Sequence, residues 1–255
     1  MASIYAVVVA AGRSSRMGGV NKQMACLSGI PVLARSLYAM DQVEILDGIV
    51  LVAPPDGVRE FTESAMGWGV KKLAAVVPGG SSRQQSVFIG LRAVPGGCGT
   101  VIIHDGARPL VSKRETGDLI SAAVKYGAAT LAVPVKDTVK VAGADNFVAG
   151  TPDRKKLWLT LTPQGFSFKE LLEAHQAAQR EGLAYTDDAS LMEAAGLRVK
   201  LVAGSYSNIK ITTPEDLAVA EALLKFREEK LAGIQNPDQH AAKSGTTNNE
   251  NMGPI

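Results

Sequence analysis

One short apolar run near the start of the chain, Ile4–Val9, limits the possible folds more than any other stretch. It ends in three consecutive valines and is followed at once by Ala10-Ala11-Gly12. A continuous apolar run of this length is typical of a strand that is buried on both faces of a parallel sheet. The small residues that follow it allow a ligand to approach the backbone closely.

The loop after this run has the composition of a phosphate-binding loop. Its small residues expose backbone N–H groups, and it holds cations at Arg13, Arg16 and Lys22, which together suit a polyphosphate. The loop is not a P-loop, because no Gly-Lys-Ser or Gly-Lys-Thr occurs in the chain. It is not a Rossmann fingerprint either, because Ser14 stands where the second Gly is required. Taken alone, the loop is equally compatible with a glycine-rich turn that carries solvated charges.

Length and composition narrow the class of protein. With 255 residues the chain forms one large α/β domain or two small ones. The net charge is only +2, and the charged residues are spread along the sequence, which argues against a nucleic-acid partner. No apolar run reaches 18 residues and no signal peptide is evident, so we expect neither a membrane segment nor secretion. Two distant cysteines, Cys26 and Cys98, favour a reduced, cytoplasmic chain, and three His without ligand spacing argue against zinc.

Strand and helix patterns alternate through the first half of the chain. This rhythm predicts β-α-β units, right-handed crossovers and a mostly parallel, Rossmann-like α/β sheet flanked by helices. Loops carrying Gly12, Gly79 and Asp105 follow predicted strands, so they should converge at the carboxyl edge of the sheet, where ligands bind. The predicted strands after the first are Gly48–Ala53, Lys71–Val77, Thr100–Ile103 and Ala128–Val133, and the predicted helices are Pro31–Met40, Val58–Met66, a helix capped by Ser81 or Ser82, and Ser112–Tyr126.

The rhythm breaks at Pro134. Two short extended stretches, Asp137–Val141 and Asn146–Gly150, flank Gly143-Ala144-Asp145 and predict a hairpin. The whole segment of about 134–162 therefore reads as an extended β-arm that leaves the core. An exposed hairpin edge with apolar residues needs a partner strand, so we expect this arm to pair with a second copy in a homodimer.

The core pattern resumes after Gly165. Further expected elements are helices Ser167–Glu181 and Asp187–Ala195, strands Leu197–Val202 and Asn208–Thr212, and a last helix from Thr213 to about Leu231. Residues 233–255 are polar and predict a disordered tail, which leaves residues 1–232 as one domain.

Several short motifs, spread over the chain in a fixed order, carry a family resemblance. They are Ala10-Ala11-Gly12 with Arg16-Met17 and Lys22-Gln23, Gly79-Gly80 with Ser86-Val87, His104 to Pro109, Asp137 to Lys140, Leu161 to Gln164, Thr186 to Ser190 and Asn208 to Asp216. Together they resemble the family of 2-C-methyl-D-erythritol 4-phosphate cytidylyltransferases, within the sugar- and polyol-phosphate nucleotidyltransferases. The likeness covers about residues 4 to 228.

The resemblance implies an activity and its substrates. CTP and methylerythritol 4-phosphate would give a cytidine-diphospho alcohol and pyrophosphate, with a divalent ion, usually Mg²⁺. The substrate phosphate would attack the α-phosphorus of CTP in line, so positioning and positive charge matter most. The attacking phosphate is already an anion at neutral pH, so no general base is required.

The resemblance also implies a role for each of fifteen residues, and some of these residues have simpler structural explanations. Lys210 could be an outward-facing strand residue, Arg154 one member of a basic surface run, and Thr186 a helix cap. Gly79, Gly80 and Ser86 could serve only to cap a helix. The implied roles are catalytic for Arg16, Lys22, Arg154 and Lys210; substrate-binding for Asp105, Arg108, Thr138, Thr162 and Thr186, with Asp105 also a metal ligand; and nucleotide-binding for Ala10, Ala11, Gly12, Gly79, Gly80 and Ser86. Thr138 and Arg154 would reach the substrate of the neighbouring subunit.

Three positions depart from the family pattern. They are Ser14, Asn21 and Gly106, where Gly, Pro and Ala respectively are usual, and none of them removes a charge. The nearest alternative function is a ribitol 5-phosphate cytidylyltransferase, which shares the template but usually has bulkier residues where this chain has Gly106-Ala107. More distant alternatives are a sugar-1-phosphate uridylyl- or guanylyltransferase, a Rossmann dehydrogenase, and a non-catalytic nucleotide-binding protein on the same fold.

Overall fold

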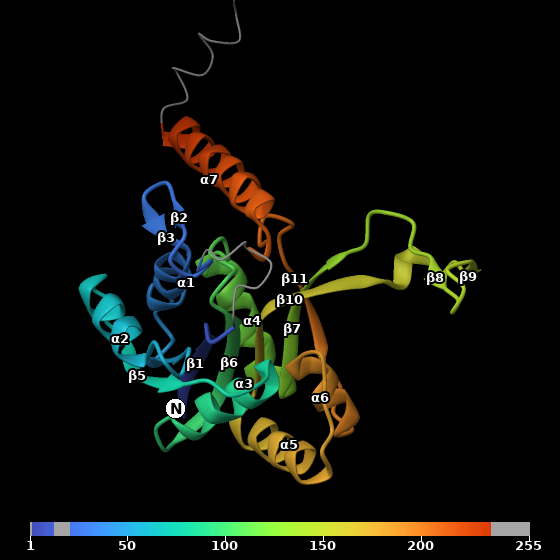
Figure 1. The fold of residues 1–255 in the computed structure, drawn as a ribbon, viewed down its shortest axis with the longest axis horizontal. Helices are drawn as coiled ribbons and strands as arrows, with labels where there is room; N and C mark the ends of the chain where they lie inside the picture. Colours follow the sequence, from blue (N-terminus) through green and yellow to red (C-terminus); the bar gives the residue numbers. More distant parts are fainter. Residues whose placement is uncertain (1, 13–20, 236–255) are drawn as a thin grey trace, which may run out of the picture.

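A seven-stranded sheet forms the centre of the molecule (Figure 1). The computed structural model describes residues 2–12 and 21–235, with side chains up to Lys230. The strand order is β11-β7-β10-β6-β1-β4-β5, and every strand runs parallel to the others except β10. The prediction of a mostly parallel α/β sheet is confirmed. The strands are β1 (Ser3–Val9), β4 (Gly48–Ala53), β5 (Leu73–Pro78), β6 (Cys98–Asp105), β7 (Ala128–Pro134), β10 (Trp158–Ser167) and β11 (Lys200–Ala203).

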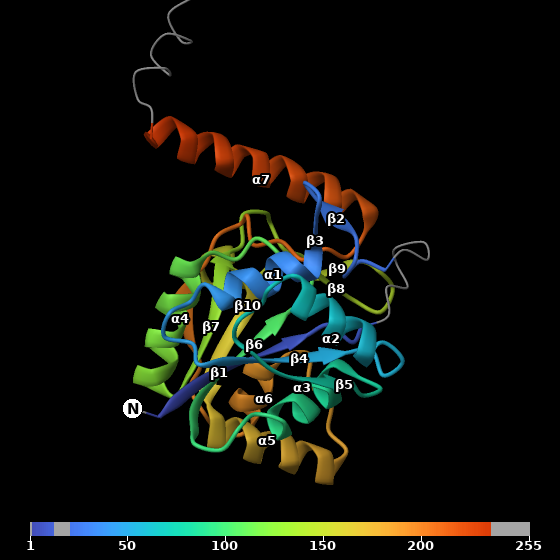
Figure 2. The same ribbon diagram turned by 90° about the vertical axis from the view of Figure 1, so that its left-hand side faces the viewer.

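Helices cover both faces of this sheet (Figure 2). One face carries α1 (Val32–Asp41), α2 (Val58–Gly67) and α4 (Lys113–Tyr126), and the other carries α3 (Arg83–Arg92), α5 (Phe168–Glu181) and α6 (Asp188–Ala194). Strand β1 explains why the first apolar run is continuous. Its Ala6 and Val8 pack toward α1, whereas Val7 and Val9 pack toward α3, so both faces of the strand are buried.

Helix α3 lies unusually close to the sheet. A Cβ atom on Gly90 would stand 2.4 Å from Cγ1 of Val7 and 2.8 Å from Cγ2 of Val52, so a side chain at this position would push the helix outward. The helix begins at Arg83, and the Ser82 side chain caps it by accepting a hydrogen bond from the backbone N–H of Gln85. Gly90 therefore lets the second half of α3 pack directly on β1 and β4.

Strand β10 differs from the sequence-based expectation. It runs antiparallel between β6 and β7 in the middle of the sheet, although residues through 162 were expected to belong to the excursion and the core to resume only after Gly165. The strand tolerates Pro163, which has no N–H to donate, because its register with β7 shifts between Thr160 and Gln164. The chain has thus rejoined the sheet by Trp158.

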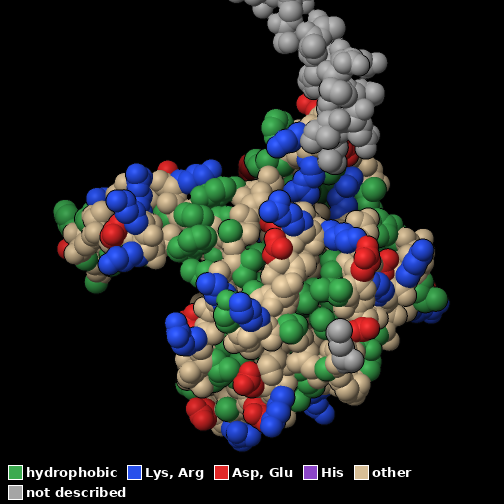
Figure 3. All heavy atoms as spheres, turned by 180° about the vertical axis from the view of Figure 1, so that it is seen from behind, with side chains coloured by type: hydrophobic (Ala, Val, Ile, Leu, Met, Phe, Trp, Pro, Cys, Tyr) green, Lys and Arg blue, Asp and Glu red, His purple; other side chains and the backbone are tan. Residues whose placement is uncertain are grey.

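The segment of residues 135–157, here called the arm, projects from the sheet (Figure 1). It contains the short strands β8 (Val141–Ala142) and β9 (Val148–Gly150), which pair antiparallel, and a 3₁₀ turn, η1 (Arg154–Lys156). The predicted hairpin is confirmed, with shorter strands than expected. Phe147 and Val148, beside its turn, are exposed. Figure 3 shows that hydrophobic side chains lie among lysines and arginines on the surface of the arm.

The carboxyl-terminal helix packs on a small hairpin that the sequence did not predict. Strands β2 (Cys26–Leu27) and β3 (Ile30–Pro31) lie beside α7 (Pro214–Gln235), where carboxylate oxygens of Glu221 accept hydrogen bonds from the N–H and hydroxyl of Ser28. Helix α7 continues past Leu231 to Gln235 and so overlaps the first three residues of the predicted tail, whereas residues 236–255 lie outside the described part. No helix in the described ranges combines the length and apolar character that crossing a bilayer requires.

The predicted strand Asn208–Thr212 is absent from the described sheet. The segment is irregular and makes one backbone bond across to the loop after β6, from Ile211 N to Ala107 O, at 2.8 Å. The alternating apolar residues that suggested a strand are explained by packing, because the Ile211 side chain is buried against Ala220 and Leu224 of α7.

Candidate active site

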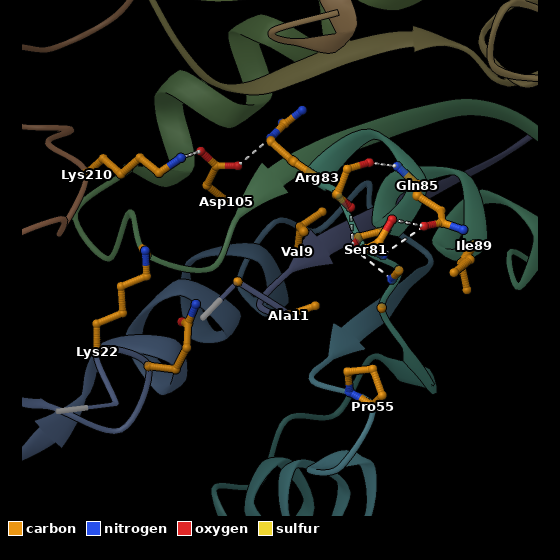
Figure 4. A pocket seen from close by; sticks show the side chains of 17 residues that line it. Val9, Ala11, Lys22, Pro55, Ser81, Arg83, Gln85, Ile89, Asp105 and Lys210 are labelled. Atoms are coloured by element: carbon orange, nitrogen blue, oxygen red, sulfur yellow. Dashed lines mark hydrogen bonds and ion pairs between the residues drawn. The ribbon is translucent and has the colours of Figure 1, made fainter. Parts of the chain in front are cut away.

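A cavity of about 930 Å³ opens at the carboxyl ends of β1, β4, β5 and β6. This is the edge where open parallel sheets bind ligands, and the volume suits a nucleotide. Backbone hydrogen bonds lock the loops at this edge together, from Gly106 N to Val9 O, from Ala10 N to Val52 O and from Gly79 N to Ala53 O. Eight of the predicted site residues line the cavity, namely Ala11, Gly12, Lys22, Gly79, Gly80, Ser86, Asp105 and Lys210 (Figure 4).

The loops after β1 and β5 touch at Gly79. A Cβ atom on Gly79 would lie 2.2 Å from Cβ of Ala11 and 3.3 Å from the carbonyl oxygen of Ala53, so only glycine fits. Ala10 is fully buried beneath this contact and does not itself line the cavity. Gly79 and Ala11 therefore bring two stretches of bare backbone to one wall, as a nucleotide-binding surface requires.

Hydrogen bonds from the start of α3 shape the loop at Gly80. The Ser86 hydroxyl donates to Ser82 O at 2.8 Å and accepts from Gly80 N at 3.1 Å. The Gln85 side-chain oxygen accepts from Ser81 N at 2.7 Å. Ser82 is the residue that caps the helix, so Ser86 has a different part, which is to hold the Gly80 loop against the cavity wall.

Asp105, at the end of β6, is surrounded by cations. Lys210 Nζ lies 2.6 Å from its Oδ2 and Arg83 Nε lies 3.1 Å from its Oδ1, while Arg108 Nε is 3.9 Å from Oδ2. Burial works to raise the pKa of this carboxyl, but Arg83, Lys210 and Arg108 outweigh it and hold the pKa well below its usual range. Asp105 is thus a fixed anion within a positive surround.

Thr162 and His104 fix the backbone at Asp105. The Thr162 hydroxyl accepts from Asp105 N at 3.0 Å and lies 3.2 Å from Nδ1 of His104. Nε2 of His104 is 3.2 Å from the carbonyl oxygen of Arg108, and since a carbonyl only accepts, Nε2 carries the proton and Nδ1 accepts from Thr162. Burial lowers the pKa of His104 to about 4, so the ring is neutral.

Two lysines approach the reaction space from different sides. Lys210 points inward from the irregular segment before α7, and Lys22 reaches up from the turn before β2 (Figure 4). Arg108 lies behind Asp105 outside the cavity lining and donates from Nη1 to Asn208 O at 2.7 Å. Arg16 lies outside the described residues.

Three predicted site residues are not brought to the cavity of their own chain. Thr138 and Arg154 are exposed on the arm, where Arg154 Nη1 donates to Lys136 O at 2.9 Å. Thr186 is also exposed, and the expectation that it caps α6 is wrong, because Asp187 is the cap and accepts from Ser190 N.

Sequence reasoning missed Arg83, Asp188 and Asn208 as parts of the site. Arg83 lies between the Gly79-Gly80 and Ser86-Val87 motifs. Asp188 belongs to the motif Thr186 to Ser190, and Asn208 begins the motif Asn208 to Asp216. Nothing in their spacing indicates which partners they meet, because each contact joins distant segments of the chain.

The cavity provides limited ligands for a metal ion. The described ranges contain no group of three His, Cys, Asp or Glu residues arranged to hold one, and Asp105 is the acidic side chain on the described lining. Mg²⁺ in nucleotide enzymes commonly takes one or two carboxylates and completes its shell with phosphate oxygens and water. A single carboxylate on the wall of a nucleotide-sized cavity fits that mode of binding.

Comparison with known proteins places these features in a family. Residues 4–226 match the family model described as IspD: 2-C-methyl-D-erythritol 4-phosphate cytidylyltransferase. The 2-C-methyl-D-erythritol 4-phosphate cytidylyltransferase of Pelotomaculum thermopropionicum is 50% identical over 91% of this chain and 98% of its own length. The protein of the same name from Desulforamulus reducens is 50% identical over 89% of this chain and 98% of its own length.

Solved structures give the same result. The 4-diphosphocytidyl-2C-methyl-D-erythritol synthase of Anaerococcus prevotii superposes with a TM-score of 0.79 at 32% identity, covering 88% of this chain and 96% of its own. The 2-C-methyl-D-erythritol 4-phosphate cytidylyltransferase of Thermus thermophilus superposes with a TM-score of 0.71 at 34% identity, covering 86% and 98%.

Proposed function

The chain belongs to the 2-C-methyl-D-erythritol 4-phosphate cytidylyltransferase family, and on this premise we propose that its reaction takes place in the cavity beside Asp105. The enzyme transfers CMP from CTP to 2-C-methyl-D-erythritol 4-phosphate, which yields 4-diphosphocytidyl-2-C-methyl-D-erythritol and pyrophosphate in the non-mevalonate isoprenoid pathway. The observation that supports this location is the meeting of Lys22, Lys210 and Asp105 around one nucleotide-sized space.

CTP would bind along the wall made by the loops after β1 and β5. Gly12, Gly79 and Gly80 present backbone with no side chain in the way. Ala11 continues that surface, and the buried Ala10 would support it from beneath. The N–H groups of Gly79, Gly80 and Ser81 already donate within the protein, so this loop would meet the cytosine edge through its carbonyl oxygens. The triphosphate would then extend toward Lys22 and the loop that carries Arg16.

The chemistry needs positive charge more than a base. The substrate phosphate is already an anion, so it can attack the α-phosphorus in line without giving up a proton. Charge grows on the phosphoryl oxygens and on the departing pyrophosphate, and Lys22, Arg16 and Lys210 would stabilise it. Lys210 would hold the attacking phosphate, because it already stands beside Asp105 at the cavity wall.

Asp105 would also hold a magnesium ion. Such an ion neutralises phosphate charge when it is bound, and the chain's own part is to present one fixed carboxylate to it. Thr162 holds Asp105 from the backbone, and Arg108 holds it from behind. Substrate hydroxyls would then meet the same carboxylate.

Thr138 and Arg154 would act on a neighbouring molecule. Both residues lie on the arm, away from the lining of their own cavity, so a direct role requires a second copy. The arm's exposed apolar tip supports a homodimer in which each arm completes the site of its partner. Thr186, exposed just before α6, would contact substrate only if the surrounding loop moves inward.

Free thiols at Cys26 and Cys98 favour the cytoplasm as the compartment.

The test is pyrophosphate release in the presence of CTP and Mg²⁺. Methylerythritol 4-phosphate and ribitol 5-phosphate are compared as acceptors under identical conditions. Release with the first alone supports the proposed assignment of substrates to this cavity, once a Lys210→Gln variant is shown to abolish it. Release with ribitol 5-phosphate alone would contradict it.

A further inference from the structure

Arg83 joins two carboxylates that come from different parts of the fold. Its Nε atom lies 3.1 Å from Oδ1 of Asp105, at the end of β6, and its Nη1 atom lies 2.8 Å from Oδ2 of Asp188, in the first turn of α6. Asp105 borders the cavity, whereas Asp188 does not. The guanidinium therefore ties a residue of the reaction site to a residue outside it (Figure 4 shows the end at Asp105).

Asp188 is itself held firmly. Its side chain is 2% exposed, and its other oxygen, Oδ1, lies 3.0 Å from Nε2 of His175 in α5. The His175 ring is stacked on Phe88 of α3, with ring centroids 6.1 Å apart and planes 11° from parallel. Helices α3, α5 and α6 thus meet at this group, so Asp188 is a rigid anchor.

The tether has a consequence for Asp105. With Oδ1 bound to Arg83, the carboxylate is turned so that Oδ2 faces Lys210 at 2.6 Å. Burial works to lower the pKa of Arg83, but Asp188 and Asp105 outweigh it and raise the pKa, so the guanidinium stays charged. Because Nε and Nη1 are both held by carboxylates, the planar fork can act as a fixed spacer between Asp105 and Asp188.

We propose that Arg83 is a positioning residue for the transfer reaction, which acts by fixing the carboxylate of Asp105 through its bond to Asp188. The inference rests on the proposed roles of Asp105 and Lys210 in this cavity. Arg83 lines the cavity as well, but the role proposed for it requires no contact with the reacting atoms. Its effect reaches them through the orientation of Asp105 and, from there, of Lys210.

The test compares Arg83→Lys and Asp188→Asn with Arg92→Lys as a matched control. Lysine keeps the charge but has no fork, so it reaches one carboxylate at a time. Both site variants should lower kcat by about 10-fold to 100-fold, because misplacement by about 1 Å is costly, and KM for CTP should change by less than about threefold. Arg92, at the far end of the same helix, should tolerate the change.

The double variant Arg83→Lys/Asp188→Asn tests whether the two residues act through one shared tether or independently. Since each single change breaks the same tether, the double variant should be no slower than the slower single variant. Additive losses would overturn the proposal, as would an Asp188→Asn enzyme with the native kcat. Losses that merely follow the folded fraction, as measured by the melting temperature, would also overturn it.

Chemical rescue adds a readout that a purely structural role would not move. Guanidinium ion, well below denaturing concentrations, should raise kcat of an Arg83→Ala variant by about fivefold or more, because it can fill the vacated fork between the carboxylates. Failure of rescue in a folded variant would overturn the proposal. The native enzyme is assayed alongside, and a native enzyme that releases no pyrophosphate with methylerythritol 4-phosphate would overturn the proposed function and this role with it. Variants as fast as an active native enzyme would overturn the role of Arg83 alone.

Discussion

Lys210 Nζ stands 2.6 Å from Oδ2 of Asp105, although 105 positions separate the two residues in the chain. The pair joins the end of a central strand to the segment that enters the last helix. It explains why neither residue is an ordinary surface charge.

Replacing Lys210 by glutamine should lower kcat by about 100-fold or more, because a preorganised cation at the reacting phosphate is lost. Lys200→Gln is the matched control, since Lys200 is an exposed lysine on β11 far from the cavity lining. Steady-state pyrophosphate release measures both variants. Equal losses in the two would contradict a role for Lys210 at the phosphate.

Thr162→Val should reduce both stability and activity. The backbone N–H of Asp105 loses its partner, which typically costs about 1–3 kcal/mol when the group is buried. The loosened Asp105 should then lower kcat, as shown by steady-state assays. Thr116→Val is the control, because that buried hydroxyl bonds only to the Ser112 carbonyl of its own helix, which also accepts from Thr116 N. The free energy of unfolding in urea and kcat are measured for both variants. A Thr162→Val enzyme with native kcat would contradict the role of Thr162 in holding Asp105.

Gly79→Ala should weaken CTP binding. The new methyl would lie 2.2 Å from Cβ of Ala11, so the two nucleotide loops must separate. We expect KM for CTP to rise by about tenfold or more while the acceptor KM changes little. Gly117→Ala serves as the control, because it adds a methyl into open space within α4 and should stabilise the helix by up to about 1 kcal/mol. Calorimetric titration with CTP decides between them.

His104 should make stability depend on pH between about 6.5 and 4. Burial lowers its folded-state pKa to about 4, whereas the unfolded chain takes up a proton near 6.5. The stability that neutral His104 provides is therefore full above pH 6.5 and is lost as pH falls toward 4, by about 3 kcal/mol in total. The pKa of Asp105 is lowered in the folded state, so its contribution to stability is lost only as pH falls below the usual pKa of an aspartate. The pH range in which His104 acts therefore lies above the range in which Asp105 acts. Urea midpoints at pH 7.5 and 5.0 should differ less in His104→Gln, and an unchanged difference would refute this assignment.

Phe147→Asp should convert the proposed dimer toward monomer. Phe147 is 74% exposed at the tip of the arm, and a charge there would oppose burial against a second copy. Phe226→Asp is the control, because that side chain is 66% exposed on α7, away from the arm. Sedimentation velocity at micromolar protein reads both. A native chain that sediments as a monomer would dispose of the dimer, and with it the shared role of Arg154.

The sequence alone was sufficient to predict the strands that consist of a continuous run of apolar or small residues. In β1 and β4 every residue is apolar or small because helices cover both faces, and that regularity is visible without a structure. Strand β10 was not predictable, because Pro163 and Gly165 are typical of a loop, and only the gap between β6 and β7 makes them part of a strand. Ile209 and Ile211 misled in the opposite direction, since they alternate like a strand yet pack against a helix.

The candidate site divides in a similar way. The small residues and cations of the first loop, and Asp105 after an apolar strand, could be identified from composition and position alone. Arg83 could not, because an arginine at the start of a helix is common and its partner Asp188 is 105 positions away. The pairing depends on two helices meeting over one sheet edge, which is a property of the tertiary fold.

The central place of β10 also has a consequence for synthesis. Strands β6 and β7 leave the ribosome before β10 does, yet β10 must enter between them. Until residue 167 has emerged, two facing edges of the sheet lack their hydrogen-bonding strand, and an open edge accepts any strand that is near. The arm is made during this same interval, so it lengthens the time for which the nascent chain is most exposed to mispairing with its neighbours.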